Sequence, residues 1–306
     1  MNVMLRDKLT VIWRMTHPLA AEDRAAWDSL IPAFTEELPH PERVELVITD
    51  QYRAVAGEYA VQSPTRANPG MTAADYQAVK VDGAMAAAKT NELPGGKATV
   101  VVNASLVRLG HERASRSLLH EAQHVRLLQD EDGAWGVHRR VAFTLPDDLS
   151  FDFIWLAETA IDEFRCERAL YEAGVSPLNM GSDPADYSGI IASFEPVRYG
   201  FRRTADVLAA YQGAMSVLDR LGQFLAYGAA YIAIEQTRAA KWVSIPSMAQ
   251  LVGIVSDLAS AHQKVSDERL AAHCIELARM LRRTLRDNGF DSYLQPDGGL
   301  YFDVLW

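Results

Sequence analysis

The chain has 306 residues, of which 49% are hydrophobic, so it is long enough for one large domain or two smaller ones with a sizeable core. Its formal net charge of −10 disfavours broad binding to the phosphate backbone of nucleic acids. Two cysteines provide no disulfide framework and suit a reducing compartment, which favours a cytoplasmic location.

The first part of the chain predicts a small sheet flanked by helices. Residues 1 to about 40 are interpreted as helical, because acidic residues precede apolar ones at helical spacing. Val44–Asp50 is a β-branched run that predicts a strand, and Val100–Val102 marks the best strand in the sequence. Asp82-Gly83 predicts a hairpin turn, and Gly95-Gly96 predicts a turn directly before the second strand.

From Glu112 onward the pattern is almost wholly helical. One helix is predicted over 112–129, and another from Ser150 to Gly174, where glycine is a typical helix stop. Long amphipathic helices follow to about Asn288. The uncharged run Leu221–Ile234 is too short to span a bilayer and indicates a buried, tightly packed helix.

These elements predict an α+β fold. It has a small N-terminal sheet, a helix that carries the motif His120-Glu121-x-x-His124, and a mostly helical C-terminal region. Residues 175–189 are rich in Pro, Gly, Ser and Asp, which is typical of a linker. The predicted domains are therefore residues 1–185 and 186–306. The basic runs Arg198–Arg203 and Arg279–Arg286 are interpreted as solvated helix faces.

Two histidines four residues apart flank a glutamate at His120-Glu121-x-x-His124. Positions i and i+4 lie on the same face of an α-helix, so both histidines can direct a ring nitrogen at one metal ion. Zinc accepts neutral imidazole and lowers the pKa of a bound water toward about 7, so that the nearby Glu121 can complete its deprotonation. The spacing therefore predicts two zinc ligands and a general base from one helical turn. The opposite side of the helix is apolar and is expected to seat it on a core: Leu118, Ala122 and Val125.

A third ligand is expected on the helix that follows, because the continuation H-x-x-G-x-x-H is absent. Two carboxylate pairs at i, i+4 spacing are available there, Glu163 with Glu167 and Glu158 with Asp162. The first pair lies on an otherwise apolar stripe, so it is expected to face inward and to need a partner such as a metal ion. The second lies on a more polar stripe with Arg165 and is interpreted as solvated. Glu163 is the predicted third ligand, with Glu167 as acceptor for a ligand histidine's other N–H. The alternative third ligand is Glu158, with Asp162 as the acceptor for the histidine N–H.

This arrangement resembles the zincin metallopeptidases, and more narrowly the gluzincins, in which a helix bearing H-E-x-x-H is followed by a helix bearing a glutamate ligand. LLHEAQH, Leu118–His124, matches the first element, and DEFRCERAL, Asp162–Leu170, is similar to the second. The resemblance covers roughly residues 40–175. The family pattern E-x-x-x-D is met literally by Glu158 to Asp162, which keeps Glu158 open as a ligand beside Glu163. By this resemblance the substrate is a peptide, bound as an added strand along the edge of the sheet.

The predicted function is zinc-dependent hydrolysis of peptide bonds, with Zn²⁺ as cofactor and Glu121 as general base. The alternative is a regulatory or partner-binding protein that retains the metal site with restricted or no hydrolysis. The expected partner is a peptide or protein, and no nucleic-acid or membrane partner is expected. Tyr187, Tyr199 and His138 are candidates for stabilising the transition state, and the sequence does not choose among them.

Overall fold

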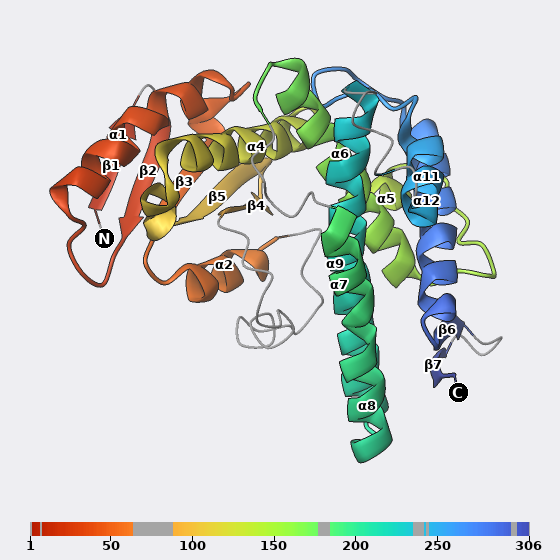
Figure 1. Ribbon diagram of the computed structural model, residues 1–306. Helices are drawn as coiled ribbons and strands as arrows, with labels where there is room; N and C mark the ends of the chain where they lie inside the picture. Colours follow the sequence, from red (N-terminus) through yellow and green to blue (C-terminus); the bar gives the residue numbers. More distant parts are fainter. Residues whose placement is uncertain are drawn as a thin grey trace. The chain divides into compact units, whose positions relative to one another are not determined.

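The computed structural model describes residues 2–6, 8–63, 88–176, 184–234, 242, 245–294 and 299–305. The chain divides into two compact units, Met1–Asp132 and Gly133–Trp306, and each is described by itself below. Together they contain helices and two small sheets, so the predicted α+β class is confirmed (Figure 1). None of the described helices is long and apolar enough to cross a bilayer.

The first unit is built on a five-stranded mixed sheet with the order β1-β2-β3-β5-β4. The three central strands are parallel, and the two edge strands are antiparallel to their neighbours. The strands are β1 Asn2–Arg6, β2 Leu9–Arg14, β3 Val44–Thr49, β4 Ala88–Leu93 and β5 Lys97–Asn103. The predicted strands after residue 43 and around Val100–Val102 are thus confirmed.

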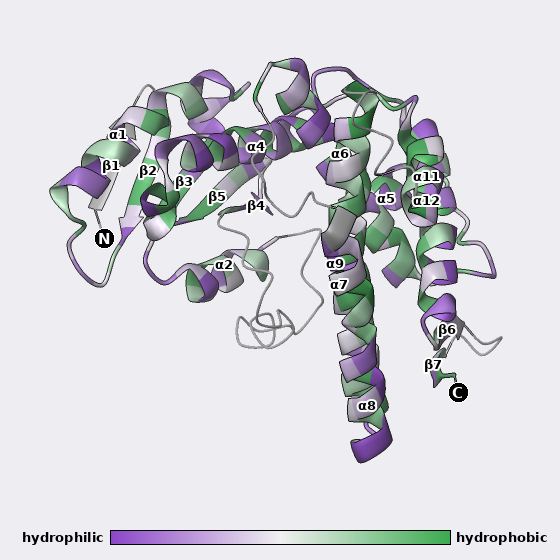
Figure 2. Cartoon of the chain, in the orientation of Figure 1, coloured by the Kyte–Doolittle hydropathy of each residue, from purple (hydrophilic) through white to green (hydrophobic). Residues whose placement is uncertain are grey.

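Helices cover both faces of this sheet (Figure 1). Helices α1, Ala21–Glu36, and α4, His111–Gln129, share a hydrophobic core with one face, whereas α2, Tyr52–Ala60, packs on the other. The short 3₁₀ helices η1, Pro41–Arg43, and η2, Ala104–Leu109, lead into β3 and α4. In Figure 2 the central strands are mainly hydrophobic, while α4 alternates hydrophilic and hydrophobic residues, as expected for a helix with one buried side.

The prediction of helix from residue 1 to about 40 is wrong for its first half, which forms β1 and β2 before α1 begins. On β2 the alternate side chains Leu9, Val11 and Trp13 are at most 5% exposed, which is the period of a strand. β2 pairs in parallel with β3, a segment more than thirty residues away, so local spacing could not reveal the pairing. The helical interpretation holds for Ala21–Glu36.

A tight turn joins β4 to β5. Gly95 and Gly96 have φ values of +79° and +69°, a backbone conformation that favours glycine, and the turn predicted at these residues is confirmed. The hairpin predicted at Asp82-Gly83 lies outside the described residues.

The second unit is mainly helical, with a two-stranded antiparallel sheet near its C-terminal end. Helix α6 packs chiefly against α9, and α12 packs against α6. The helices are α5 Val137–Arg140, α6 Phe151–Glu172, α7 Pro184–Ala192, α8 Phe194–Thr204, α9 Val207–Ile234, α11 Pro246–Val255 and α12 Asp267–Asp287. The strands are β6 Phe290–Leu294 and β7 Leu300–Val304, in a segment whose aromatic residues alone did not predict strands.

The chain divides into its two compact units between Asp132 and Gly133, whereas the sequence predicts a domain boundary after residue 185. Helix α6, assigned by that prediction to the first domain, is part of the second compact unit. The predicted linker, 175–189, is described only at its two ends, because 177–183 lie outside the described residues. The boundary at 185 therefore stays a prediction.

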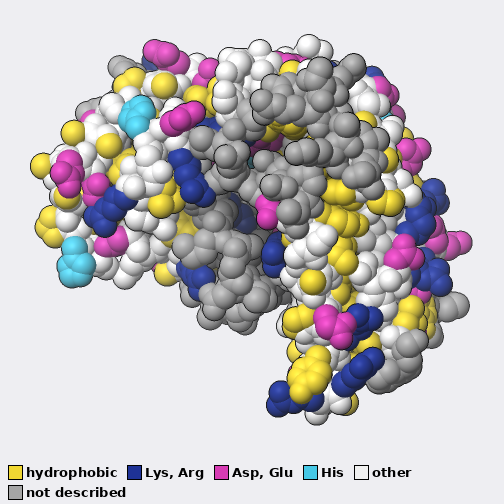
Figure 3. Space-filling model, viewed as in Figure 1, with side chains coloured by type: hydrophobic (Ala, Val, Ile, Leu, Met, Phe, Trp, Pro, Cys, Tyr) yellow, Lys and Arg dark blue, Asp and Glu magenta, His cyan; other side chains and the backbone are white. Residues whose placement is uncertain are grey.

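The two basic runs lie on solvated helix faces, as predicted, and the structure adds that they have acidic partners. Arg198 pairs with Glu195 on α8, and Arg202 and Arg203 are exposed. On α12, Arg279 forms an ion pair with Asp148 at 3.1 Å. In the space-filling view, Lys and Arg side chains are interspersed with acidic ones around the end of α8 (Figure 3).

Two of the three glycines of helix α9, Gly222 and Gly228, differ in the room around them. The predicted tight packing of Leu221–Ile234 is confirmed. A Cβ added at Gly228 would lie 2.5 Å from Met248 Cε and 3.0 Å from the ring of Trp242. A Cβ at Gly222 would meet only the Cβ of Ala160, at 3.5 Å, which is an ordinary contact.

We expect Gly228→Ala to lower the free energy of unfolding by about 1–3 kcal/mol, because the indole of Trp242 must shift in a packed core. The matched variant Gly222→Ala is expected to be neutral or to stabilise by up to about 1 kcal/mol, because alanine is the better helix former. Urea denaturation of both variants and the wild type measures the difference. Equal effects of the two substitutions would show that the space around the glycines does not control stability.

Candidate metal centre

The H-E-x-x-H motif lies on α4, as predicted from its spacing. The opposite side of the helix, Leu118, Ala122 and Val125, is at most 1% exposed and belongs to the core between α4 and the sheet. This buried side fixes the rotation of the helix about its axis. The direction in which the motif faces is therefore set by packing within the first unit.

The two imidazole rings converge. His120 Nε2 lies 3.1 Å from His124 Nε2, and the rings meet edge to face with their centroids 4.8 Å apart. Two nitrogens bound to one tetrahedral zinc ion are about 3.3 Å apart, given Zn–N bonds of about 2.0–2.1 Å. His120 is 8% exposed and His124 is partly buried, so the pair is largely shielded from solvent but still accessible to it. The separation of the two nitrogens fits a single metal ion.

Glu121 is held by a neighbouring strand. Its side chain is 8% exposed, and the Thr90 hydroxyl donates a hydrogen bond to its Oε2 at 2.7 Å and approaches its backbone carbonyl oxygen at 3.3 Å. Thr90 lies on β4, an edge strand of the sheet on which α4 packs. The bond orients the carboxylate, which can then take up or release a proton in a defined place.

Sequence reasoning did not single out Thr90. Its side chain reaches α4 because β4 pairs with β5 in a register that puts Thr90 opposite Val100, whose side chain lies in the core shared with α4. A strand pattern over 88–93 would have been the only signal available in the sequence.

The pair Glu158 and Asp162 on α6 is buried, so the prediction that it is solvated is wrong. Glu158 is 0% exposed and Asp162 is 7% exposed. Arg165, on the same stripe, is also 0% exposed and donates to the backbone carbonyl oxygens of Ala259, at 3.1 Å, and Gln263, at 2.8 Å. Helices α9 and α12 pack against α6, so a stripe of α6 that is polar in the sequence can become buried.

Both oxygens of Glu158 are used inside the second unit. Oε1 lies 2.6 Å from His138 Nδ1, and Oε2 accepts from the backbone N–H of Gly136 at 3.0 Å. Burial raises the pKa of Glu158, and the hydrogen bonds from His138 and Gly136 act against that rise. His138 also accepts a hydrogen bond at Nε2 from Arg139, so both of its ring nitrogens are engaged.

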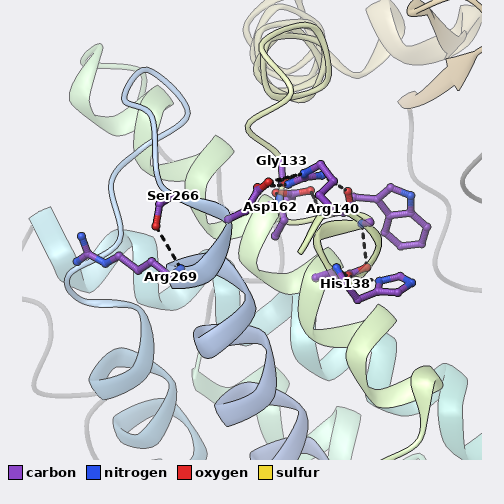
Figure 4. A network of polar contacts seen from close by, with 11 residues as sticks. Gly133, His138, Arg140, Asp162, Ser266 and Arg269 are labelled. Atoms are coloured by element: carbon purple, nitrogen blue, oxygen red, sulfur yellow. Dashed lines mark hydrogen bonds and ion pairs between the residues drawn. The ribbon is translucent and has the colours of Figure 1, made fainter. Parts of the chain in front are cut away.

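Asp162 continues the same network (Figure 4). It accepts hydrogen bonds from the backbone N–H groups of Ala134, at 2.6 Å, and Trp135, at 3.0 Å. Arg140 donates to the carbonyl oxygen of Trp135 and pairs with Asp267 at the start of α12. The pair Glu158 and Asp162 thus holds the segment 133–140 against α6, and the literal E-x-x-x-D match has a structural use in this fold.

Glu163 and Glu167 lie on the other stripe of α6. Glu167 is 2% exposed, as expected for an inward carboxylate, and Glu163 is partly buried. Glu163 accepts a hydrogen bond at Oε2 from the Tyr227 hydroxyl on α9, at 2.9 Å. Sequence reasoning missed Tyr227, because nothing local relates it to a residue 64 positions earlier.

The remaining candidates are spread over the second unit. The Tyr187 hydroxyl lies 3.2 Å from Ser247 Oγ, and Tyr199 is 60% exposed. The contacts of Tyr187, Tyr199 and His138 do not identify any of the three as the stabiliser of a transition state.

No protein-family model, curated protein or solved structure matches this chain. What the site can do is therefore read from its own side chains. Within the first unit, His120 and His124 offer two ring nitrogens that lie close together. Within the second unit, Glu163 is a carboxylate that is only partly buried. Imidazole nitrogens are common ligands of zinc and of other transition metals.

Proposed function

We propose that this chain is a zinc-dependent metallopeptidase of the zincin type, in which His120, His124 and Glu163 hold the metal and Glu121 is the general base. The observation that carries the proposal is the pair of Nε2 atoms 3.1 Å apart on α4, with the buried Glu121 next to His120 in the chain. Zinc is the proposed ion because two nitrogens and one oxygen are the ligands of many catalytic zinc sites.

The choice of Glu163 over Glu158 rests on the hydrogen bonds within the second unit. Glu158 has each oxygen engaged and is fully buried, so a metal ion would have to displace a backbone N–H or the His138 ring. Glu163 is only partly buried, and it accepts a hydrogen bond at Oε2 from the Tyr227 hydroxyl. The proposal requires α6 to present Glu163 to α4.

A bound zinc ion supplies an acidified water and polarises the scissile carbonyl group. Glu121 would accept a proton from the attacking water and pass it to the leaving amine. Thr90 engages Oε2 of Glu121, which leaves Oε1 as the proposed proton acceptor. Thr90 also holds the carboxylate in one orientation through both steps.

The proposed substrate is a peptide that adds to the sheet along β4. Among the described strands, β4 is an edge strand that pairs with β5 alone. An extended peptide can hydrogen-bond to such an edge through its main chain. Thr90, which contacts the general base, is part of the same strand, so a peptide on this edge would lie near Glu121.

Elemental analysis of the purified protein tests the metal site. We expect about one zinc per chain, loss of zinc in His124→Ala, a reduced zinc content in Glu163→Gln, and a retained zinc content in Glu158→Gln. Circular dichroism of each variant shows whether it is folded. Retention of zinc in Glu163→Gln with loss in a folded Glu158→Gln would move the third ligand to Glu158. A wild type that neither contains zinc nor takes it up would overturn the proposal.

A further inference from the structure

Helix α9 supplies a hydrogen bond to the carboxylate that is proposed as the third metal ligand. The Tyr227 hydroxyl donates to Glu163 Oε2 at 2.9 Å, and both residues belong to the second unit. We propose that Tyr227 is a positioning residue that orients Glu163 for the metal, so that the C-terminal helical region controls metal affinity. This inference rests on the proposed function, because it takes Glu163 to be a ligand.

The chemistry of the two groups favours this role. An unperturbed tyrosine has a pKa of about 10, so at neutral pH its hydroxyl is protonated and can donate to a carboxylate. The bond engages Oε2 of Glu163 and limits the rotamers that the carboxylate can adopt. Partners of this kind orient metal ligands, and their loss typically costs about 10–100-fold in metal affinity.

Close packing of α6 on α9 makes this hydrogen bond possible. A Cβ at Gly222 would meet the Cβ of Ala160 at 3.5 Å, so the small residues at this crossing allow the two helices to approach closely. Ala160 lies one helical turn before Glu163, and Gly222 lies little more than one turn before Tyr227. The close approach at the first pair therefore brings the second pair within hydrogen-bond distance.

The next turn of α9 offers a matched control. Tyr231 lies one turn after Tyr227, and its ring meets that of Tyr171 on α6 edge to face, with centroids 5.9 Å apart. Tyr231→Phe removes a hydroxyl from the same helix and keeps the ring contact. It is expected to leave metal affinity unchanged, because its ring packs on Tyr171, which is not a proposed metal ligand.

The experiment measures zinc affinity by competition with a chromophoric chelator, on the full chain. The variants are Tyr227→Phe, Tyr231→Phe, Glu163→Gln and the double variant Tyr227→Phe/Glu163→Gln. We expect Tyr227→Phe to weaken zinc binding about 10–100-fold. The double variant is expected to bind no more weakly than Glu163→Gln alone, because the tyrosine acts through that carboxylate. Visible spectra of the Co²⁺-loaded protein are expected to change in Tyr227→Phe and not in Tyr231→Phe.

Wild-type affinity and an unchanged Co²⁺ spectrum in Tyr227→Phe, with weakened binding in Glu163→Gln, would overturn the positioning role and leave the ligand assignment intact. Additive losses in the double variant would also overturn it, since Tyr227 would then act independently of Glu163. Absence of metal binding by the wild type would instead refute the proposed function.

Discussion

Glu121→Gln is expected to reduce peptide hydrolysis by about 10²–10⁴-fold while zinc content stays at the wild-type level. Glutamine keeps the shape of the side chain and can still accept the Thr90 hydrogen bond, but it cannot take a proton from water. The ligand nitrogens of His120 and His124 are unchanged, so metal binding should survive. Hydrolysis is measured by mass spectrometry of a mixed peptide pool, and zinc by elemental analysis.

Glu112→Gln is the control for this prediction. Glu112 lies in the first turn of the same helix and is exposed, so its variant is expected to cleave and bind zinc like the wild type. Hydrolysis by Glu121→Gln at the wild-type rate would show that Glu121 is not the general base. A wild type that holds zinc and cleaves no peptide in the pool would favour the alternative function, a regulatory or partner-binding protein with restricted or no hydrolysis.

Glu158→Ala is expected to lower the free energy of unfolding by about 3–5 kcal/mol, the cost typical of removing one partner from a buried ionic network. The substitution leaves the His138 ring and the backbone N–H of Gly136 without their acceptor inside a packed core. Urea denaturation followed by circular dichroism measures the loss. Glu172→Ala is the control, because that residue lies at the exposed end of α6, in an ion pair with Arg168 worth about 0–1 kcal/mol. Similar losses for the two variants would show that the buried network does not stabilise the fold.

Glu158 also predicts that the free energy of unfolding depends on pH. Burial raises the pKa of Glu158 above its ordinary value of 4.5, so the folded protein holds this proton at a pH where the unfolded chain has released it. The contribution to stability is therefore full below about pH 4.5 and is lost as the pH rises through the folded-state pKa. Unfolding free energies of the wild type and of Glu158→Gln are measured from acid to neutral pH. The stability of the wild type relative to Glu158→Gln should decrease as the pH rises. A difference that does not vary with pH would contradict the raised pKa.

Local geometry was sufficient for the motif helix and for several other elements. His120 and His124 converge because i, i+4 positions share a helix face, and this holds wherever the helix packs. The apolar side of the helix and the strand around Val100–Val102 likewise follow from the periods of helix and strand. The mixed α+β class and the buried α9 could be predicted for the same reason.

Only the tertiary structure decided which polar side chains are buried and what they contact. A stripe of α6 that is polar in sequence is buried, since a helix surrounded by others can bury carboxylates whose oxygens accept backbone N–H groups, as Glu158 and Asp162 show. Strand β2 depends on pairing with β3, and the contacts of Thr90 with Glu121 and of Tyr227 with Glu163 join segments that are distant along the chain. The sequence by itself supplied the candidate donor groups, which are the two histidines of α4 and the two carboxylate pairs of α6. The hydrogen bonds that orient Glu121 and Glu163 come from non-local packing, which no periodicity encodes.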